Sequence, residues 1–179
     1  MHVSTDCVFS GQKGRYTEGD IPDPVDLYGR SKLLGELEGP GVLTLRTSII
    51  GRELQTQNGL VEWFLSQRGG TVNGFAHAIY TGLTTEALAL IIVNVLRSDR
   101  SLHGLWHVSS AAISKYELLR KLNVAFATGT EILRDESLVC DRSLESARFW
   151  AATRLHRPLW DDMISSMAND PTPYRSSGG

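Results

Sequence analysis

A tyrosine and a lysine stand four residues apart in the segment Tyr28-Gly29-Arg30-Ser31-Lys32. On a helix, this spacing places both side chains on one face. A free tyrosine hydroxyl has a pKa of about 10, too high for efficient proton transfer at neutral pH. A neighbouring ammonium group stabilises the phenolate and lowers that pKa, so the pair suits general acid–base catalysis. Taken alone, the pair more often marks an exposed tyrosine beside a solvated lysine.

Alternating strands and helices must position this pair. Residues 1–9 are rich in β-branched and aromatic side chains and predict a strand, which carries the hydroxyl of Thr5. Asp26 is expected to cap the helix that bears the tyrosine and lysine, which runs to about Leu37. Residues 42–50 are apolar and bounded by glycines, as in a buried parallel strand. The pattern therefore predicts an α/β fold.

The rest of the chain continues this alternation. Ser114 and Glu117 have the spacing of a capping box, which predicts a helix that begins after Ser114. Further strands are expected over residues 71–80 and 104–109, and further helices over residues 60–67, 84–96, 144–152 and 160–168. One incomplete domain over residues 1–170 and a disordered tail over residues 171–179 are expected.

Composition narrows the functional class. The chain has 179 residues, with 18 basic and 20 acidic side chains, so its formal net charge is −2. This balance argues against a nucleic-acid partner, which normally requires a basic surface. No apolar run reaches the ~20 residues of a membrane span. The two cysteines, Cys7 and Cys140, are too few for a disulfide scaffold and favour a cytoplasmic location.

Other candidate chemistry is weak. His103 and His107 lie four apart in an expected strand without a third ligand, so no metal is predicted. Cys7 has no partner base in a recognisable motif and is expected to pack rather than act as a nucleophile. Four tryptophans lie in amphipathic segments and are expected to pack in the core or in the lobe: Trp63, Trp106, Trp150 and Trp160.

Three segments together resemble the extended short-chain dehydrogenase/reductase superfamily. They are Ser4–Gly11 (STDCVFSG), Leu27–Leu33 (LYGRSKL) and Arg46–Ser48 (RTS). Within it, the similarity is greatest to the RmlD-like family of dTDP-4-dehydrorhamnose reductases, with weaker likeness over residues 104–107 and 141–149. The resemblance implies the C-terminal part of a doubly wound, Rossmann-like parallel sheet with a small sugar-nucleotide-binding lobe. It also implies NADP or NAD as cofactor and a 4-keto nucleotide sugar as substrate.

The resemblance assigns roles residue by residue. Tyr28 would be the general acid/base, Lys32 would lower its pKa, and Thr5 would hold the keto oxygen. The residues implied to contact the cofactor are Tyr28, Lys32, Arg46 and Ser48. Those implied to contact the substrate are Thr5, Asp6, Cys7 and Arg142. Arg142 would meet the substrate diphosphate, although a surface salt bridge explains it equally well, and Arg46 fits a structural role or one near the cofactor.

The sequence departs from the family pattern at several points. It contains no G-x-G-x-x-G or related turn to bind a cofactor pyrophosphate. The chain is therefore expected to lack the N-terminal cofactor-binding half, on the order of a hundred residues at ~30 per βαβ unit. Cys7 and Ile49 replace aromatic residues common in close relatives, which leaves the sugar open. The short stretch of residues 122–131 suggests a small deletion.

Loss of that half would leave an exposed sheet edge, so marginal stability, weak dinucleotide binding and self-association through the edge are expected.

Two other functions stay open. One is a nucleotide-sugar epimerase or dehydratase of the same superfamily, which uses the same tyrosine and lysine. A dehydratase usually carries a second acid after Asp6, and Cys7 stands there instead. The other is a non-catalytic regulatory protein, as in the regulatory subunit of methionine adenosyltransferase, which resembles this family and acts by binding a partner.

Overall fold

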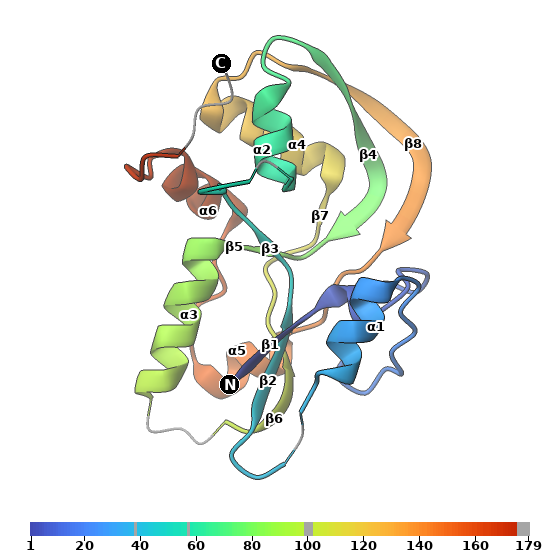
Figure 1. Cartoon of the computed structure of the whole chain (residues 1–179), viewed down its shortest axis with the longest axis vertical. Coiled ribbons are helices and arrows are strands. Elements are labelled where there is room, and N and C mark those ends of the chain that lie inside the picture. Colours follow the sequence, from blue (N-terminus) through green and yellow to red (C-terminus); the bar gives the residue numbers. More distant parts are fainter. Residues whose placement is uncertain (38, 57, 99–101, 175–179) are drawn as a thin grey trace.

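The computed structural model describes residues 1–37, 39–56, 58–98 and 102–174. The tail expected over 171–179 lies outside the described residues from 175 onward, and residues 171–174 form no helix or strand. Two lobes share a continuous core (Figure 1). Within the described ranges, no helix is long and apolar enough to cross a membrane.

The lower lobe in Figure 1 is built on a parallel sheet. Its strands are β1 (His2–Thr5), β2 (Leu43–Thr47) and β6 (Gly104–His107), in the order β1-β2-β6. Helix α1 (Leu27–Leu34) lies on one side of this sheet and α3 (Thr85–Arg97) on the other, with α5 (Ala147–Thr153) beside β6. Helices on both faces of a parallel sheet define the doubly wound arrangement. The predicted α/β, Rossmann-like class is confirmed.

The upper lobe pairs two long, curved strands. β4 (Thr71–Tyr80) runs parallel to β8 (Glu131–Asp141), with an irregularity between Phe75 and His77, and antiparallel to the short β7 (Ile113–Ser114). Alternate residues of β4 are buried, since one face packs against α4 (Lys115–Phe126). Helices α2 (Leu60–Ser66) and α6 (Trp160–Ala168) pack against α4. β3 (Ile49–Ile50) and β5 (Leu83–Thr84) form a small parallel sheet where the lobes meet.

Two expected strands are interrupted. The strand expected over residues 1–9 ends at Thr5 and continues as a short 3₁₀ helix, η1 (Asp6–Val8). The strand expected over residues 42–50 divides into β2 and β3, with Ser48 between them. In η1, the Thr5 hydroxyl accepts a hydrogen bond from the Cys7 N–H, and this local bond competes with continued strand pairing. The helix expected over residues 144–152 begins only at Ala147.

Two strands of the parallel sheet, β2 and β6, carry buried polar side chains. His107 is completely buried, and its Nδ1 lies 3.0 Å from the Tyr16 carbonyl oxygen. Its Nε2 is buried without a hydrogen-bond partner. Burial, helped by the charge of Arg46, lowers the pKa of His107 to about 4. A neutral ring that donates from Nδ1 fits this environment, whereas an imidazolium would be buried beside another cation.

Acidification should therefore destabilise the protein through His107. The neutral ring contributes stability fully above the usual pKa of 6.5, and this contribution is lost as pH falls from 6.5 towards 4. The expected loss is roughly 1 kcal/mol per pH unit in this window. His107→Asn keeps a donor for Tyr16, so the urea-derived free energy of unfolding should fall less steeply with acid. His156→Asn, at an exposed histidine, is the control; equal slopes in wild type and His107→Asn would contradict the assignment.

Candidate functional site

The first wall of the site is the turn that follows β1. Thr5 is 6% exposed, and its hydroxyl donates to Asp6 Oδ1 at 3.2 Å while it accepts from the Cys7 N–H at 3.2 Å. These two bonds fix the orientation of the Thr5 side chain at the carboxyl end of a parallel strand. In open α/β sheets this edge is where ligands bind.

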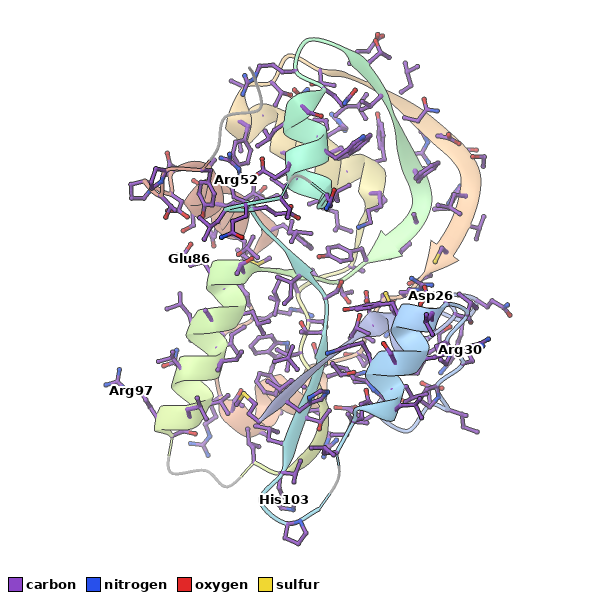
Figure 2. The ribbon with its side chains drawn as sticks, in the orientation of Figure 1. Asp26, Arg30, Arg52, Glu86, Arg97 and His103 are labelled. Carbon is purple, nitrogen blue, oxygen red and sulfur yellow. The ribbon has the colours of Figure 1, made fainter. Side chains whose placement is uncertain are left out.

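Helix α1 forms the second wall. The Asp26 carboxylate accepts a hydrogen bond from the Gly29 N–H at 2.7 Å, so the expected N-cap is confirmed. Figure 2 places Asp26 at the end of α1 nearest the upper lobe. Gly29 faces η1 so closely that a Cβ there would lie 2.2 Å from the Cys7 carbonyl oxygen. The helix can approach the turn only because residue 29 has no side chain.

This close approach positions the tyrosine and lysine. Lys32 Nζ donates to the Val3 carbonyl oxygen of β1 at 2.7 Å, which ties the end of α1 to the sheet. Tyr28 is 56% exposed. Tyr28, Lys32 and Thr5 line a single cleft of about 410 Å³, together with Asp6, Cys7 and Ser48. The structure thus brings together the three residues that the sequence analysis assigns to proton transfer.

A second pocket, of about 400 Å³, adjoins this cleft and shares Asp6, Cys7 and Ser48 with it. It extends into the upper lobe along β4, β8 and α4. Arg142 lines it, with its guanidinium 3.5 Å from Cys7 Sγ. All the residues expected at the substrate therefore border the cleft, the pocket or both.

Asp6 lies between the two cavities and is 4% exposed. Its burial raises its pKa, against the hydrogen bonds from Ser48 and Thr5 and the charge of Arg142, which lower it. Burial and the negative charge of Asp6 likewise raise the pKa of the Cys7 thiol. A thiol held protonated is a poor nucleophile, which agrees with the packing role expected for Cys7.

Arg46 is the expected cofactor residue that the structure does not bring to the cleft. It is 3% exposed, and its Nε and Nη2 bind the two carboxylate oxygens of Glu36 at 2.8 and 2.7 Å. Burial would raise the pKa of Glu36, but the hydrogen bonds from Arg46 and Ser4 hold it below its usual value. Such a bidentate buried pair fixes the link from α1 to β2, so cofactor contact by Arg46 finds no support in this geometry.

Sequence reasoning missed two residues of the second pocket. Lys115 begins α4, and Tyr80 ends β4. The Ser114 cap locates the start of the helix, but no local signal shows that β4 and β8 curve over it. Trp63, expected to pack in the core or in the lobe, instead lines this pocket and is 39% exposed. Among the described residues, no cluster of three or more His, Cys, Asp or Glu side chains could hold a metal.

The residues fit one end of a dinucleotide better than its centre. Tyr28, Lys32 and Ser48 offer polar groups in the cleft. Gly11 and Gly14 are used for packing, since a Cβ on either would lie within 2.5 Å of Cys140 Sγ or the Asp141 carboxylate. Neither glycine stands directly before a helix, as those of a pyrophosphate-binding turn do, and the sequence has no G-x-G-x-x-G motif elsewhere.

Comparison with known proteins establishes the family. The profile of the RmlD substrate-binding domain matches residues 1–136. The chain belongs to this family.

Two curated relatives show its range. The β subunit of methionine adenosyltransferase 2 from Danio rerio is 33% identical over 138 residues, or 70% of this chain and 43% of that protein. The probable low-salt glycan biosynthesis reductase Agl14 from Haloferax volcanii is 33% identical over 159 residues, or 83% of this chain and 52% of that protein. The chain thus spans about half the length of these relatives.

A solved structure shares the fold. The dTDP-4-dehydrorhamnose reductase of Bacillus anthracis, solved with NADP, superposes with a TM-score of 0.77 at 23% identity. The alignment covers 93% of this chain and 63% of that protein.

Gly29→Ala tests the packing of α1. The methyl group should push α1 away from η1 and lower the free energy of unfolding by about 1–3 kcal/mol, as overpacking does. Urea denaturation measures this. Gly35→Ala, at the end of the same helix with contacts no closer than 3.5 Å, is the matched control; equal stability for the two variants would refute the close contact.

Proposed function

We propose that this chain is the substrate-binding and proton-transferring part of an NAD(P)-dependent reductase of nucleotide sugars, which acts in the cytoplasm on a 4-keto sugar. The arrangement of Thr5, Tyr28 and Lys32 on one cleft carries the proposal. Membership of the RmlD substrate-binding family supports the nucleotide-sugar class of substrate. NADPH or NADH, when bound, supplies hydride to the keto carbon.

The chain's own residues handle the proton. The Thr5 hydroxyl accepts a hydrogen bond from the Cys7 N–H, and on substrate binding it turns its one proton from Asp6 to the substrate oxygen, which it holds in the cleft. Tyr28 lies on the same cleft and gives its proton to the developing alkoxide. Lys32 stabilises the resulting phenolate through its positive charge. Its hydrogen bond to Val3 keeps that charge beside the sheet edge.

The second pocket accommodates the remainder of the nucleotide sugar. Its wall is mostly apolar, which suits a sugar face or a base, and Arg142 supplies a cation for the diphosphate. Dehydratases and epimerases of the superfamily share this scaffold, and Cys7 in place of a second acid counts against the dehydratase.

A second candidate function is regulation by partner binding. The similarity to a methionine adenosyltransferase β subunit and the lack of a glycine-rich turn favour it. The edge of β1 is unpaired within the described residues, since its sheet has the order β1-β2-β6. Another strand can pair with such an unpaired edge. We therefore also propose that two copies of this chain associate through the edge of β1.

The chain should bind nucleotide sugars better than dinucleotides. Calorimetric titration is expected to show saturable binding of a nucleoside-diphosphate hexose and only weak, millimolar binding of NADPH or NADH. Arg142→Gln should weaken nucleotide-sugar binding at least tenfold, whereas Arg120→Gln, on the exposed side of α4, should not. Dinucleotide binding without nucleotide-sugar binding would overturn the proposal.

Proton transfer should depend on the Tyr28 hydroxyl. In assays with NADPH and a panel of 4-keto nucleotide sugars, Tyr28→Phe is expected to lower turnover by about 10²–10⁴-fold, the usual contribution of a general acid. Tyr116→Phe, on α4, is the matched control. The Tyr28→Phe variant should still bind the nucleotide sugar, which would show that it has lost the proton-transfer step and not the binding site. Absence of turnover in the wild type at saturating cofactor would favour the regulatory candidate.

A further inference from the structure

Lys115 contributes a positive charge to the second pocket and forms no ion pair with the described residues. It is the first residue of α4, directly after the Ser114 cap. Its Nζ lies 4.0 Å from the centre of the Tyr80 ring. Within the described chain, it makes no ion pair or hydrogen bond to a protein acceptor. The face of the Tyr80 ring attracts this cation, whereas the positive end of the helix dipole disfavours it, so the charge is left without a direct anionic partner.

The pocket around Lys115 is otherwise mostly apolar. It holds about 400 Å³, and its apolar wall includes Leu60, Trp63, Phe75, Ile79, Leu119 and Leu138. Burial against these side chains lowers the pKa of Lys115. A cation in such surroundings is costly unless a ligand group neutralises it.

The polar groups of the pocket carry an excess of positive charge. Lys115 and Arg142 are two cations, and Asp6 is the one carboxyl among the residues that line this pocket. That carboxyl already accepts hydrogen bonds from the Thr5 hydroxyl and the Cys7 thiol, and no ion pair joins it to Lys115. An anion in the pocket would restore the balance.

A second unpaired donor lies beside Lys115. Tyr80 is 5% exposed, and its buried hydroxyl faces Ser48 without a well-formed hydrogen bond among the described residues. It lines the same pocket, next to Ser48. A buried hydroxyl without a partner is uncommon, since burial without a hydrogen bond costs free energy. A ligand oxygen would satisfy both this hydroxyl and the lysine.

We propose that Lys115 and the Tyr80 hydroxyl bind an acidic substituent of the sugar ring, a carboxylate, and so select nucleotide-linked sugar acids. This rests on the proposed nucleotide-sugar function. Lys115 comes from α4, whereas Arg142, assigned to the diphosphate, follows β8. Asp6 and Cys7 lie close enough to Lys115 to interact with it electrostatically, and both border the cleft of Thr5. The anion that Lys115 binds therefore lies beside the ring.

The test compares three ligands with one nucleoside: the nucleoside diphosphate, its hexose and its hexuronate, in uridine and thymidine series. Calorimetry on the 179-residue chain should show that the hexuronate binds at least tenfold more tightly than the hexose. Lys115→Gln should abolish this preference without weakening the diphosphate or the hexose. Lys115→Arg, which keeps the charge, should retain it. Lys121→Gln, on the same helix and paired with Asp161, is the control.

Each other outcome counts against a defined claim. If Lys115→Gln weakens the nucleoside diphosphate as much as the hexuronate, Lys115 binds the phosphate and the proposal is wrong. If hexose and hexuronate bind equally to the wild type, the pocket does not read the carboxylate. If none of the three ligands binds, the nucleotide-sugar function itself fails. Thermal melting of each variant identifies loss of folding, and Lys115→Met provides a second uncharged side chain of similar length.

Discussion

The contact between α1 and the turn after β1 is the steric constraint on which the candidate site depends. A Cβ at residue 29 would stand 2.2 Å from the Cys7 carbonyl oxygen, so only glycine allows the helix to lie this close. That distance determines where Tyr28 and Lys32 lie relative to Thr5. It also lets Lys32 reach the Val3 carbonyl in β1, which then holds the helix in place. Packing and chemistry here have the same geometric origin.

The cleft beside α1 exists because two strands, β1 and β2, end at its edge. β1 gives way to η1 after Thr5, and β2 is separated from β3 at Ser48. Continuous strands would project these residues to alternate faces of a sheet. Because β1 and β2 both end at the same edge of the sheet, Asp6, Cys7 and Ser48 instead border two adjoining cavities. One cavity contains the proton-transfer residues, and the other extends into the upper lobe.

Electrostatics differ between the interior of the sheet and these cavities. On the strands of the sheet, Glu36 neutralises the charge of Arg46, and burial keeps His107 uncharged. In the upper pocket, Lys115 lies over the Tyr80 ring without forming an ion pair among the described residues, and the Tyr80 hydroxyl has no well-formed hydrogen bond. Buried polar groups that serve stability are normally satisfied within the protein. His107 Nε2 also lacks a partner but is fully enclosed by the protein, whereas Lys115 and Tyr80 line a cavity that a ligand can enter.

Local patterns in the sequence were enough to determine several features of this protein. Short-range hydrogen bonds predict the Asp26 cap, and helical periodicity puts Tyr28 and Lys32 on one face. Periodicity also predicts the strand over residues 71–80 and the helix over residues 160–168. The motifs around Thr5 and Tyr28 also indicated the family that the comparison confirmed. Such features need no information about distant segments.

Only the tertiary structure decided which side chains share a cavity. Arg46 belongs to the Arg-Thr-Ser motif of the family, yet its guanidinium binds Glu36, from the link after α1, rather than lining the cleft. Lys115 resembles an ordinary first-turn residue until β4 and β8 curve over the start of α4 and bury it. The course of β8 had no alternating signal, since all of its residues are exposed or half-buried. Contacts between segments far apart in sequence set these outcomes, and neither propensity nor spacing encodes them.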